Sequence, residues 1–327
     1  LFFQYFAGSF GYLFSLYHQH SLFGGPGLNY QSLTYLTNPP LAFSLLVFLL
    51  LLVNLKKLRL SLKRYIFYSF LIFIAWGFKF YGGVVCSFAL VISILLDLLN
   101  KKITIKKSSI ALLSIGFTSL IAIIIFYNPF SAIRTGGIFQ IVPFATINPI
   151  IEEKNQFYLP DLANALYILK NKVGPRLIFI ELIILIISFI FTVGTRCIGV
   201  ISVVKKTINK KIDTFDIVLL STALLTFLIS ILLVQKGDWF NPTQFFVYGM
   251  IILNIYAAEM LYQILKKSLF FSKLLGCFII LLTIPQSLNM IYSYSYNIFP
   301  FTPPQIFKNN QQIPTFIPNE EIKALNF

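Results

Sequence analysis

The sequence predicts an all-α protein that is polytopic in a membrane, with about nine transmembrane helices. Two observations predict this class. Of the 327 residues, 57% are hydrophobic and only 11% are charged, a composition typical of multi-span helical membrane proteins. The apolar residues also fall in long runs, several of which approach the length of about 20 residues that a helix needs to cross a bilayer. We therefore expect one multi-span domain over residues 1–292 and an outer C-terminal segment over residues 293–327.

Nine apolar runs are the candidate spans. The stretch 65–99 holds two of them, and it suits either one long broken helix or two short spans. Four basic clusters favour two spans turning at Phe78–Gly83, because all four clusters then lie on one side of the membrane. The runs cover residues 1–17, 40–55, 65–78, 82–99, 110–127, 177–200, 217–235, 245–265 and 274–292. The clusters are Lys56 to Arg64, Lys101 to Lys107, Arg196 to Lys211 and Lys266 to Lys273.

The side that carries the basic clusters is predicted to be cytoplasmic by the positive-inside rule. The protein is then integral to the plasma (inner) membrane, with its C-terminal tail on the outer side. The outer parts are expected to be 18–39, the turn at 78–83, the long segment 128–176, 236–244 and the tail from about 293.

The predicted outer segment 128–176 is too long for a simple connection. Within it, Asp161–Lys170 has the spacing of a helix with one apolar face. We expect interfacial helices that lie on the outer leaflet and end at the Gly174-Pro175 break. The apolar face of the Asp161–Lys170 helix consists of Leu162, Ala165, Leu166 and Leu169.

Charge and cysteine usage exclude several function classes. The net charge is +15, but the basic residues come as short clusters between apolar runs, which indicates membrane topology and not a nucleic-acid surface. Cys86, Cys197 and Cys277 lack the spacing of a disulfide framework or a zinc site. His18 and His20 are the only histidines, too few ligands for a metal site by themselves. We expect a lipid bilayer as partner, with no nucleic acid, no metal and no cofactor.

A short polar turn, Lys236–Phe246, lies between two apolar runs and reads Lys-Gly-Asp-Trp-Phe-Asn-Pro-Thr-Gln-Phe-Phe. It is therefore expected at a membrane surface, where charged and amide groups act as anchors or as parts of a site for a polar ligand. The predicted outer loops are also richer in Tyr, Asn, Gln, Gly and Pro than the inner ones. This favours handling of a polar substrate on the outer side.

Four strings carry a resemblance to a known class. They are Trp76-Gly-Phe-Lys-Phe-Tyr-Gly-Gly, Asp238-Trp-Phe-Asn-Pro-Thr-Gln-Phe-Phe-Val-Tyr, Asn38-Pro-Pro-Leu-Ala and the closing Ile317-Pro-Asn-Glu-Glu-Ile-Lys-Ala-Leu-Asn-Phe. Together they resemble the GT-C class of integral membrane glycosyltransferases, which includes mannosyltransferases and arabinosyltransferases that depend on polyprenyl-phosphate sugars. The resemblance implies transfer of a sugar from a polyprenyl-phosphate donor to an acceptor at the outer face; the acceptor is unknown.

The chain departs from this class at one position. Class members carry a catalytic acid in the first outer loop, whereas the predicted first outer loop, 18–39, contains no Asp or Glu. The chain also opens at Leu1 without a Met. Either the chain is a fragment whose missing start supplies the catalytic acid, or it is not an active member of the class; the missing start favours the first.

The resemblance implies roles for particular side chains. A carboxylate must deprotonate the acceptor, and cations must hold the phosphate leaving group. An exposed indole can stack on a sugar. The candidate residues are Asp238 as an acid; Lys79, Arg134, Arg176 and Lys236 as phosphate ligands; and Trp239 and Asn241 as further substrate contacts.

The same side chains also suit structural roles, because interfacial Lys, Arg and Trp commonly anchor spans. Asp238 then pairs with Lys236 in a solvated turn, Lys79 snorkels from a short span, Arg134 and Arg176 are anchors, and Trp239 belongs to an aromatic belt.

A polytopic transporter, or a flippase of lipid-linked saccharides, is the rival interpretation. Its signature is charge buried within spans and broken helices near the membrane midplane. Glu259 and Glu181 favour it, because a charge inside a span costs about 2.5–3.5 kcal/mol. Against it, the centre of the bilayer is otherwise almost uncharged. A saccharide polymerase or ligase is a third interpretation, but 128–176 lacks the His expected of its large outer loop.

Overall fold

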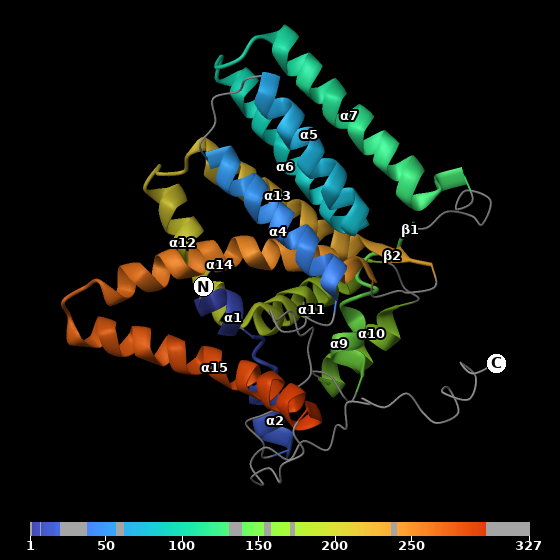
Figure 1. The fold of residues 1–327 in the computed structure, drawn as a ribbon. Helices are drawn as coiled ribbons and strands as arrows, with labels where there is room; N and C mark the ends of the chain where they lie inside the picture. Colours follow the sequence, from blue (N-terminus) through green and yellow to red (C-terminus); the bar gives the residue numbers. More distant parts are fainter. Residues whose placement is uncertain are drawn as a thin grey trace.

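The described part of the chain is built almost entirely from helices (Figure 1). The computed structural model describes residues 2–6, 8–19, 38–56, 62–130, 139–153, 158–170, 174–236 and 241–298. Within these ranges, seven helices are long and apolar enough to cross a membrane, which indicates a multi-pass membrane protein. The prediction of an all-α fold is confirmed.

These seven helices coincide with seven of the nine predicted spans, and the count of nine is not confirmed. Residues 1–17 divide into α1 (Phe2–Phe6) and α2 (Gly11–Gln19). Residues 65–78 fall on α5 (Leu62–Phe78), whose apolar part is only Phe67–Phe78. The seven are α4 (Pro39–Lys56), α6 (Phe80–Leu99), α7 (Ile105–Tyr127), α11 (Pro175–Val193) continuing through η1 (Gly194–Arg196) into α12 (Cys197–Ile208), α13 (Thr214–Leu232), η2 (Asn241–Thr243) with α14 (Gln244–Leu265), and α15 (Phe270–Ile298).

Two groups of helices make up the molecule (Figure 1). Helices α4, α5, α6 and α7 pack side by side in one group, and α12 and α13 pack on α14 in the other. Contacts of α6 with α13 and α14 join the groups. Of the most apolar 18-residue stretch in each helical segment, 72% is buried in η2 with α14 and 17% in α7. Helix α14 therefore lies at the centre of the molecule and α7 at its edge. A central position is expected for α14, because a helix that is apolar on all sides is usually buried.

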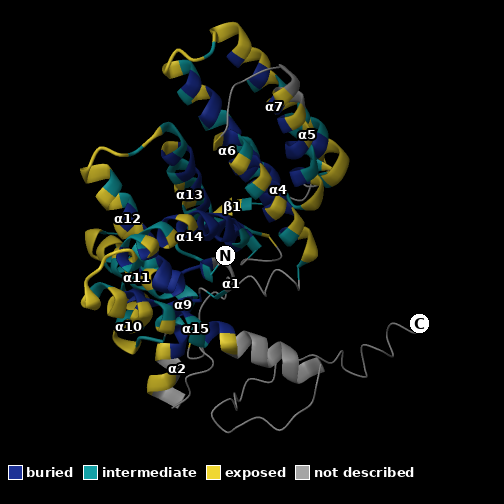
Figure 2. Ribbon diagram, turned by 60° about the vertical axis from the view of Figure 1, so that its left-hand side comes forward, coloured by how far each residue is buried: buried dark blue, intermediate teal, exposed yellow. Residues whose placement is uncertain are grey.

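Large apolar side chains remain exposed on the outward sides of the helices. Figure 2 shows exposed residues along these sides. On α7, Leu113 and Phe117 are 72% and 65% exposed, and Phe271 on α15 is 80% exposed. Apolar surface of this extent is unfavourable in water, at about 25 cal/mol per Å². It is suited to contact with lipid.

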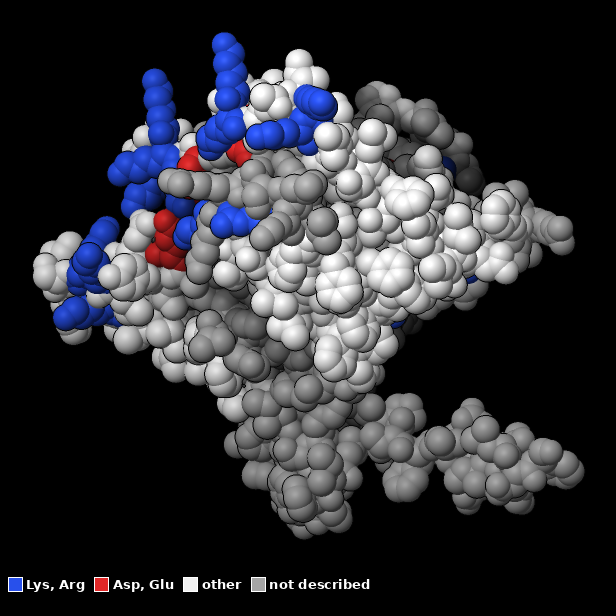
Figure 3. Space-filling model, turned by 45° about the horizontal axis from the view of Figure 1, so that its top comes forward, with Lys and Arg blue, Asp and Glu red and all other residues white. Residues whose placement is uncertain are grey.

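Basic side chains gather at one side of the molecule, with a few acidic side chains among them (Figure 3). The described loop residues Lys101, Lys102, Lys210 and Lys211 are all exposed. Arg196 differs from the rest of its predicted cluster, because it is only 2% exposed. Helix α11 continues through η1 into α12, so Arg196 lies within a helical segment and apart from the exposed loop cations.

The stretch 65–99 forms two helices, as its charge pattern predicts. Helix α5 ends at Phe78, Lys79 is extended with φ −157° and ψ 129°, and α6 begins at Phe80. The two helices then pack against each other. The turn is thus narrower than the predicted Phe78–Gly83, since Gly82 and Gly83 already belong to the first turn of α6.

A strand pair and two short helices occupy the described part of 128–176. Strand β1 (Phe139–Ile141) pairs antiparallel with β2 (Leu233–Gln235), with Gln140 opposite Val234. No strand was predicted here. Helices α9 (Asn148–Glu152) and α10 (Pro160–Leu169) follow. The predicted helix is present as α10, and its apolar face packs on α11: Leu166 is fully buried in a cluster with Ile184. Helix α11 begins at Pro175, where a break was predicted.

Candidate functional site

The turn at Lys79 and the start of the Lys236–Phe246 turn lie side by side. The hydroxyl of Tyr81 donates to Oε1 of Gln235 at 3.0 Å. Nδ2 of Asn241 donates to the same oxygen at 2.8 Å, and Nε2 of Gln244 donates to Oδ1 of Asn241 at 2.5 Å. We call Tyr81, Gln235, Asn241 and Gln244 the amide cluster. It joins α6, β2, η2 and α14, which are far apart in the sequence.

Two glycines let α6 approach its neighbours at this point. A Cβ on Gly82 would lie 2.8 Å from both Cβ of Ser44 and the hydroxyl oxygen of Tyr248, two residues that hydrogen-bond each other. A Cβ on Gly83 would lie 2.1 Å from Cδ2 of Trp76. The Gly-Gly pair therefore allows the first turn of α6 to pack against α4, α5 and α14 together.

Replacing Gly83 by alanine is expected to lower the stability of the protein by about 1–3 kcal/mol, because the added methyl overlaps the indole of Trp76 and forces the core to shift. Thermal unfolding in detergent measures the effect. Gly116→Ala on α7 is the matched control, since a Cβ there meets nothing within 4 Å and alanine favours a helix by about 1 kcal/mol. Equal stability changes in the two variants would contradict the packing of Gly83 against Trp76.

Aromatic rings surround the amide cluster. The ring centroid of Phe80 lies 5.1 Å from that of Trp76 and 5.5 Å from those of Tyr127 and Phe139. Tyr81 lies edge-on to Phe245 at 4.8 Å. The rings of Phe80 and Phe139 are tilted by 33°, whereas the other three pairs are edge-to-face. Aromatic pairs contribute about 0.5–1.5 kcal/mol beyond their buried area. They fix the α5–α6 turn against the strand pair.

Lys79 lies beside the amide cluster and is partly exposed. Its Nζ is 6.0 Å from the ring centroid of Tyr81, at the outer limit of a cation–π contact. Burial lowers the pKa of Lys79 below its usual 10.5, because desolvation disfavours the ammonium form. A half-buried ammonium beside hydrogen-bonding amides and aromatic rings can bind an anion with a polar substituent.

The other predicted site residues are distributed as follows. Asn241 lies in the amide cluster. Lys236 is exposed directly after β2. Arg176 is exposed in the first turn of α11, and it is not among the described contacts of the amide cluster. Arg134, Asp238 and Trp239 lie outside the described residues.

Sequence reasoning missed Tyr81, Gln235 and Gln244. The available signal was weak: Gln235 and Gln244 are the amide residues that end one apolar run and precede the next. Only the fold could show that Tyr81, far earlier in the chain, hydrogen-bonds to one of them.

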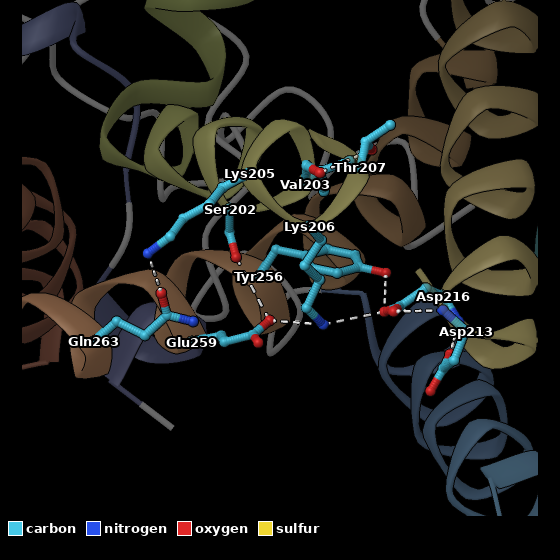
Figure 4. A network of polar contacts seen from close by, with 10 residues as sticks. All are labelled: Ser202, Val203, Lys205, Lys206, Thr207, Asp213, Asp216, Tyr256, Glu259 and Gln263. Atoms are coloured by element: carbon cyan, nitrogen blue, oxygen red, sulfur yellow. Dashed lines mark hydrogen bonds and ion pairs between the residues drawn. The ribbon is translucent and has the colours of Figure 1, made fainter. Parts of the chain in front are cut away.

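Glu259 is paired in an acid–base network at the other end of α14 (Figure 4). Nζ of Lys206 lies 3.0 Å from Oε2 of Glu259 and 3.3 Å from Oδ1 of Asp216. The hydroxyl of Tyr256 donates to the same Asp216 oxygen at 2.8 Å, and Lys206 Nζ lies 5.2 Å from the ring centroid of Tyr256. Lys206 thus bridges two carboxylates and ties α12 to α13 and α14. Glu181, the other acid predicted inside a span, is half-buried on α11.

Arg196 is the second charged group held inside the helices. Its Nε donates to Oδ1 of Asn254 at 2.7 Å, and its Nη1 lies 3.5 Å from the carbonyl oxygen of Val193. It ends η1, the 3₁₀ turn between α11 and α12. Polar side chains from α15 reach the same turn, since Thr283 Oγ1 donates to Thr195 Oγ1 at 3.1 Å.

Interruptions in two helical segments meet near Arg196. The backbone N–H of Phe10, between α1 and α2, donates to the carbonyl of Phe191 at 2.7 Å. Gly194 has φ +60°, and a Cβ on it would lie 2.2 Å from the carbonyl oxygen of Gly8. Only glycine tolerates both this backbone region and this approach. Helix α15 also contains Pro285 close in sequence to Thr283.

Comparisons of the chain with protein-family models, with curated proteins and with solved structures gave no match. The function must therefore be argued from the geometry. Among the described residues, no group of three or more His, Cys, Asp and Glu side chains is placed to hold a metal ion.

Proposed function

We propose that the protein is a membrane glycosyltransferase that moves a sugar from a polyprenyl-phosphate donor to an acceptor at the outer face of the membrane. The observation that carries the proposal is the hydrogen bonding of Tyr81 and Asn241 to Gln235. It joins two of the strings that resemble the GT-C class into one polar region next to Lys79. Amide groups and aromatic rings are the side chains that recognise sugar hydroxyls and sugar faces.

In this proposal, Lys79 binds the phosphate of the donor and the amide cluster binds its sugar. Lys236 follows β2 directly and is a second candidate phosphate ligand. The acceptor must lose a proton to a carboxylate, and the amide cluster contains none. Arg134, Arg176, Asp238 and Trp239 keep the roles proposed from the resemblance.

The binding of undecaprenyl phosphate and of undecaprenyl-phosphate mannose to the purified chain in nanodiscs tests the proposal. The expected result is tighter binding of both than of undecaprenol, which lacks the phosphate. Gln235→Ala should weaken binding of the mannosyl lipid but not of undecaprenyl phosphate. Gln263→Ala is the control, because Gln263 bonds Lys205 outside the amide cluster. Equal affinity for undecaprenol and undecaprenyl phosphate would overturn the proposal.

Substituting Lys79 is expected to show the role of its charge. Lys79→Gln should weaken undecaprenyl phosphate binding roughly 10- to 100-fold, the value of a charge-assisted hydrogen bond. Because the pKa of Lys79 is lowered, binding by the unmodified chain should fall as the pH rises towards 10.5, as the ammonium loses its proton. Lys79→Arg should keep its affinity over the same range, since arginine stays charged. An identical pH profile for both chains would contradict this role.

A transporter or flippase of lipid-linked saccharides is the second candidate. It is favoured by the meeting of two interrupted helical segments around the buried Arg196, because broken helices and buried charge are typical of substrate sites in transporters. Proteoliposomes with a fluorescent polyprenyl-phosphate sugar separate the two candidates. A flippase exposes nearly all of the label to an external quencher, whereas a transferase leaves the label of the inner leaflet protected.

A further inference from the structure

A polar cavity lies where α4 and α6 end and α13 begins, apart from the amide cluster. Its volume is about 260 Å³, below the range of about 300–1,000 Å³ typical of pockets for drug-sized ligands. A ligand of the size of a lipid headgroup suits such a volume. Its lining includes Lys56, Ser93, Asp97, Lys102, Asp213 and Phe215.

One acid of the cavity, Asp97, lies deeper than its two lysines, whereas the other acid, Asp213, is exposed. Asp97 belongs to a membrane-length helix, α6, and is 8% exposed. Ser93, one turn earlier on the same face, is 6% exposed. In contrast, Lys56 is exposed, and the side chain of Lys102 is 59% exposed. The cavity therefore offers a carboxylate and a hydroxyl inside and two ammonium groups at its rim.

Asp97 is held weakly for a carboxylate at this depth. Its ion pair with Lys102 spans 3.6 Å, and an exposed lysine contributes at most about 1 kcal/mol to such a pair. Asp97 lies in the last turn of α6, and a buried carboxylate there still needs partners that offset its desolvation. A ligand ammonium inside the cavity would add hydrogen bonds to Asp97 that Lys102 does not supply.

The second wall carries charge of the same sign as Asp97. Asp213 precedes α13, and its Oδ1 accepts from the backbone N–H of Asp216 at 2.7 Å. Phe215 and Val218 of α13 and Leu55 of α4 supply the apolar lining. Leu55 and Val218 are as deeply buried as Asp97, so the inner part of the cavity combines one carboxylate with apolar walls.

We propose that this cavity binds a phosphoethanolamine group, with its ammonium at Asp97 and Ser93 and its phosphate at Lys56 and Lys102. Lipids with an ethanolamine headgroup, in the leaflet next to the basic side of the molecule (Figure 3), and soluble phosphoethanolamine share this chemistry. The primary ammonium donates hydrogen bonds to a carboxylate, which the trimethylammonium of choline cannot do. The proposal is independent of the transferase activity.

Native mass spectrometry of the purified full chain, released from nanodiscs of mixed lipids, tests the proposal. We expect phosphatidylethanolamine to be retained roughly tenfold more than phosphatidylcholine or phosphatidylglycerol, the effect of one charge-assisted hydrogen bond. Asp97→Asn should remove this preference. Lys56→Gln, a substitution at an exposed rim residue that leaves the core intact, should reduce it. Asp161→Asn on exposed α10 and Lys273→Gln on exposed α15 are the controls and should leave it unchanged.

Soluble phosphoethanolamine, added to the chain in phosphatidylcholine nanodiscs, separates the two sources. A rise in the thermal unfolding midpoint that Asp97→Asn abolishes, without retention of phosphatidylethanolamine, would support the site and assign it to a soluble ligand. Retention without that rise would assign it to the lipid. Absence of both effects, or a lipid preference that persists in both Asp97→Asn and Lys56→Gln, would overturn the proposal.

Discussion

Asn254→Leu is expected to lower the stability of the protein by about 3 kcal/mol. Asn254 Oδ1 accepts from Nε of Arg196 at 2.7 Å, and Arg196 is 2% exposed. Removing one partner of a buried charged group leaves the charge poorly compensated, at a cost of about 3–5 kcal/mol when a full ion pair is broken. The loss of a hydrogen bond between a charged and a neutral group costs free energy at or below the lower end of that range. Unfolding by SDS in bicelles measures the change.

The double variant Arg196→Leu with Asn254→Leu is expected to recover most of this loss. Replacing both polar partners by apolar side chains of similar size is close to neutral. Asn164→Leu on the exposed side of α10 is the matched control and should change the stability by less than about 0.5 kcal/mol. If Asn254→Leu cost no more than Asn164→Leu, the buried guanidinium would not depend on this bond.

Lys206→Met is expected to cost about 3 kcal/mol, because it leaves the carboxylates of Asp216 and Glu259 without the cation that bridges them. The estimate is at the lower end of the range for broken buried pairs, since Glu259 is one-third exposed. Lys206→Arg should retain most of the stability. The same SDS titration measures both variants.

The neighbouring Lys205 provides the control for Lys206. Its Nζ bonds the amide oxygen of Gln263 at 3.0 Å on an exposed surface, so Lys205→Met should change the stability by less than about 0.5 kcal/mol. Adding Glu259→Gln to Lys206→Met should restore part of the loss, because one uncompensated carboxylate is removed. Equal effects of Lys205→Met and Lys206→Met would refute the bridging role.

The sequence predicted those features of the fold that depend on local composition. Apolar runs identified seven helices long enough to cross a membrane. The charge pattern divided 65–99 at the turn Phe78–Gly83, within which the break falls at Lys79. The apolar spacing of α10 identified the face that packs on α11. The hydropathy of residues 1–17 predicted one continuous span, but the structure divides these residues into two short helices where Gly8 packs against Gly194. That contact joins two residues far apart in the sequence and leaves no local signal.

The candidate site was less predictable, for the same reason. Asn241 and Lys79 could be singled out as polar residues at the ends of apolar runs. Asn241 bonds Gln235 and Lys79 lies near Tyr81, and the bond between Tyr81 and Gln235 depends on the packing of α6 beside β2. The burial of Arg196 was equally hidden: a cation near other cations in sequence suggests a loop, and only the position of Asn254 on α14 explains why it lies inside.

Helix α13 joins the two polar regions as a single rod. Its first turn carries Asp216, bound to Lys206, and it passes directly into β2, which ends at Gln235 of the amide cluster. At 1.5 Å per residue, its 19 residues extend over about 28 Å. A tilt of about 5° at one end therefore displaces the other by about 2.5 Å. Because α13 also lines the Asp97 cavity, a single helix connects that cavity with the strand that ends at Gln235.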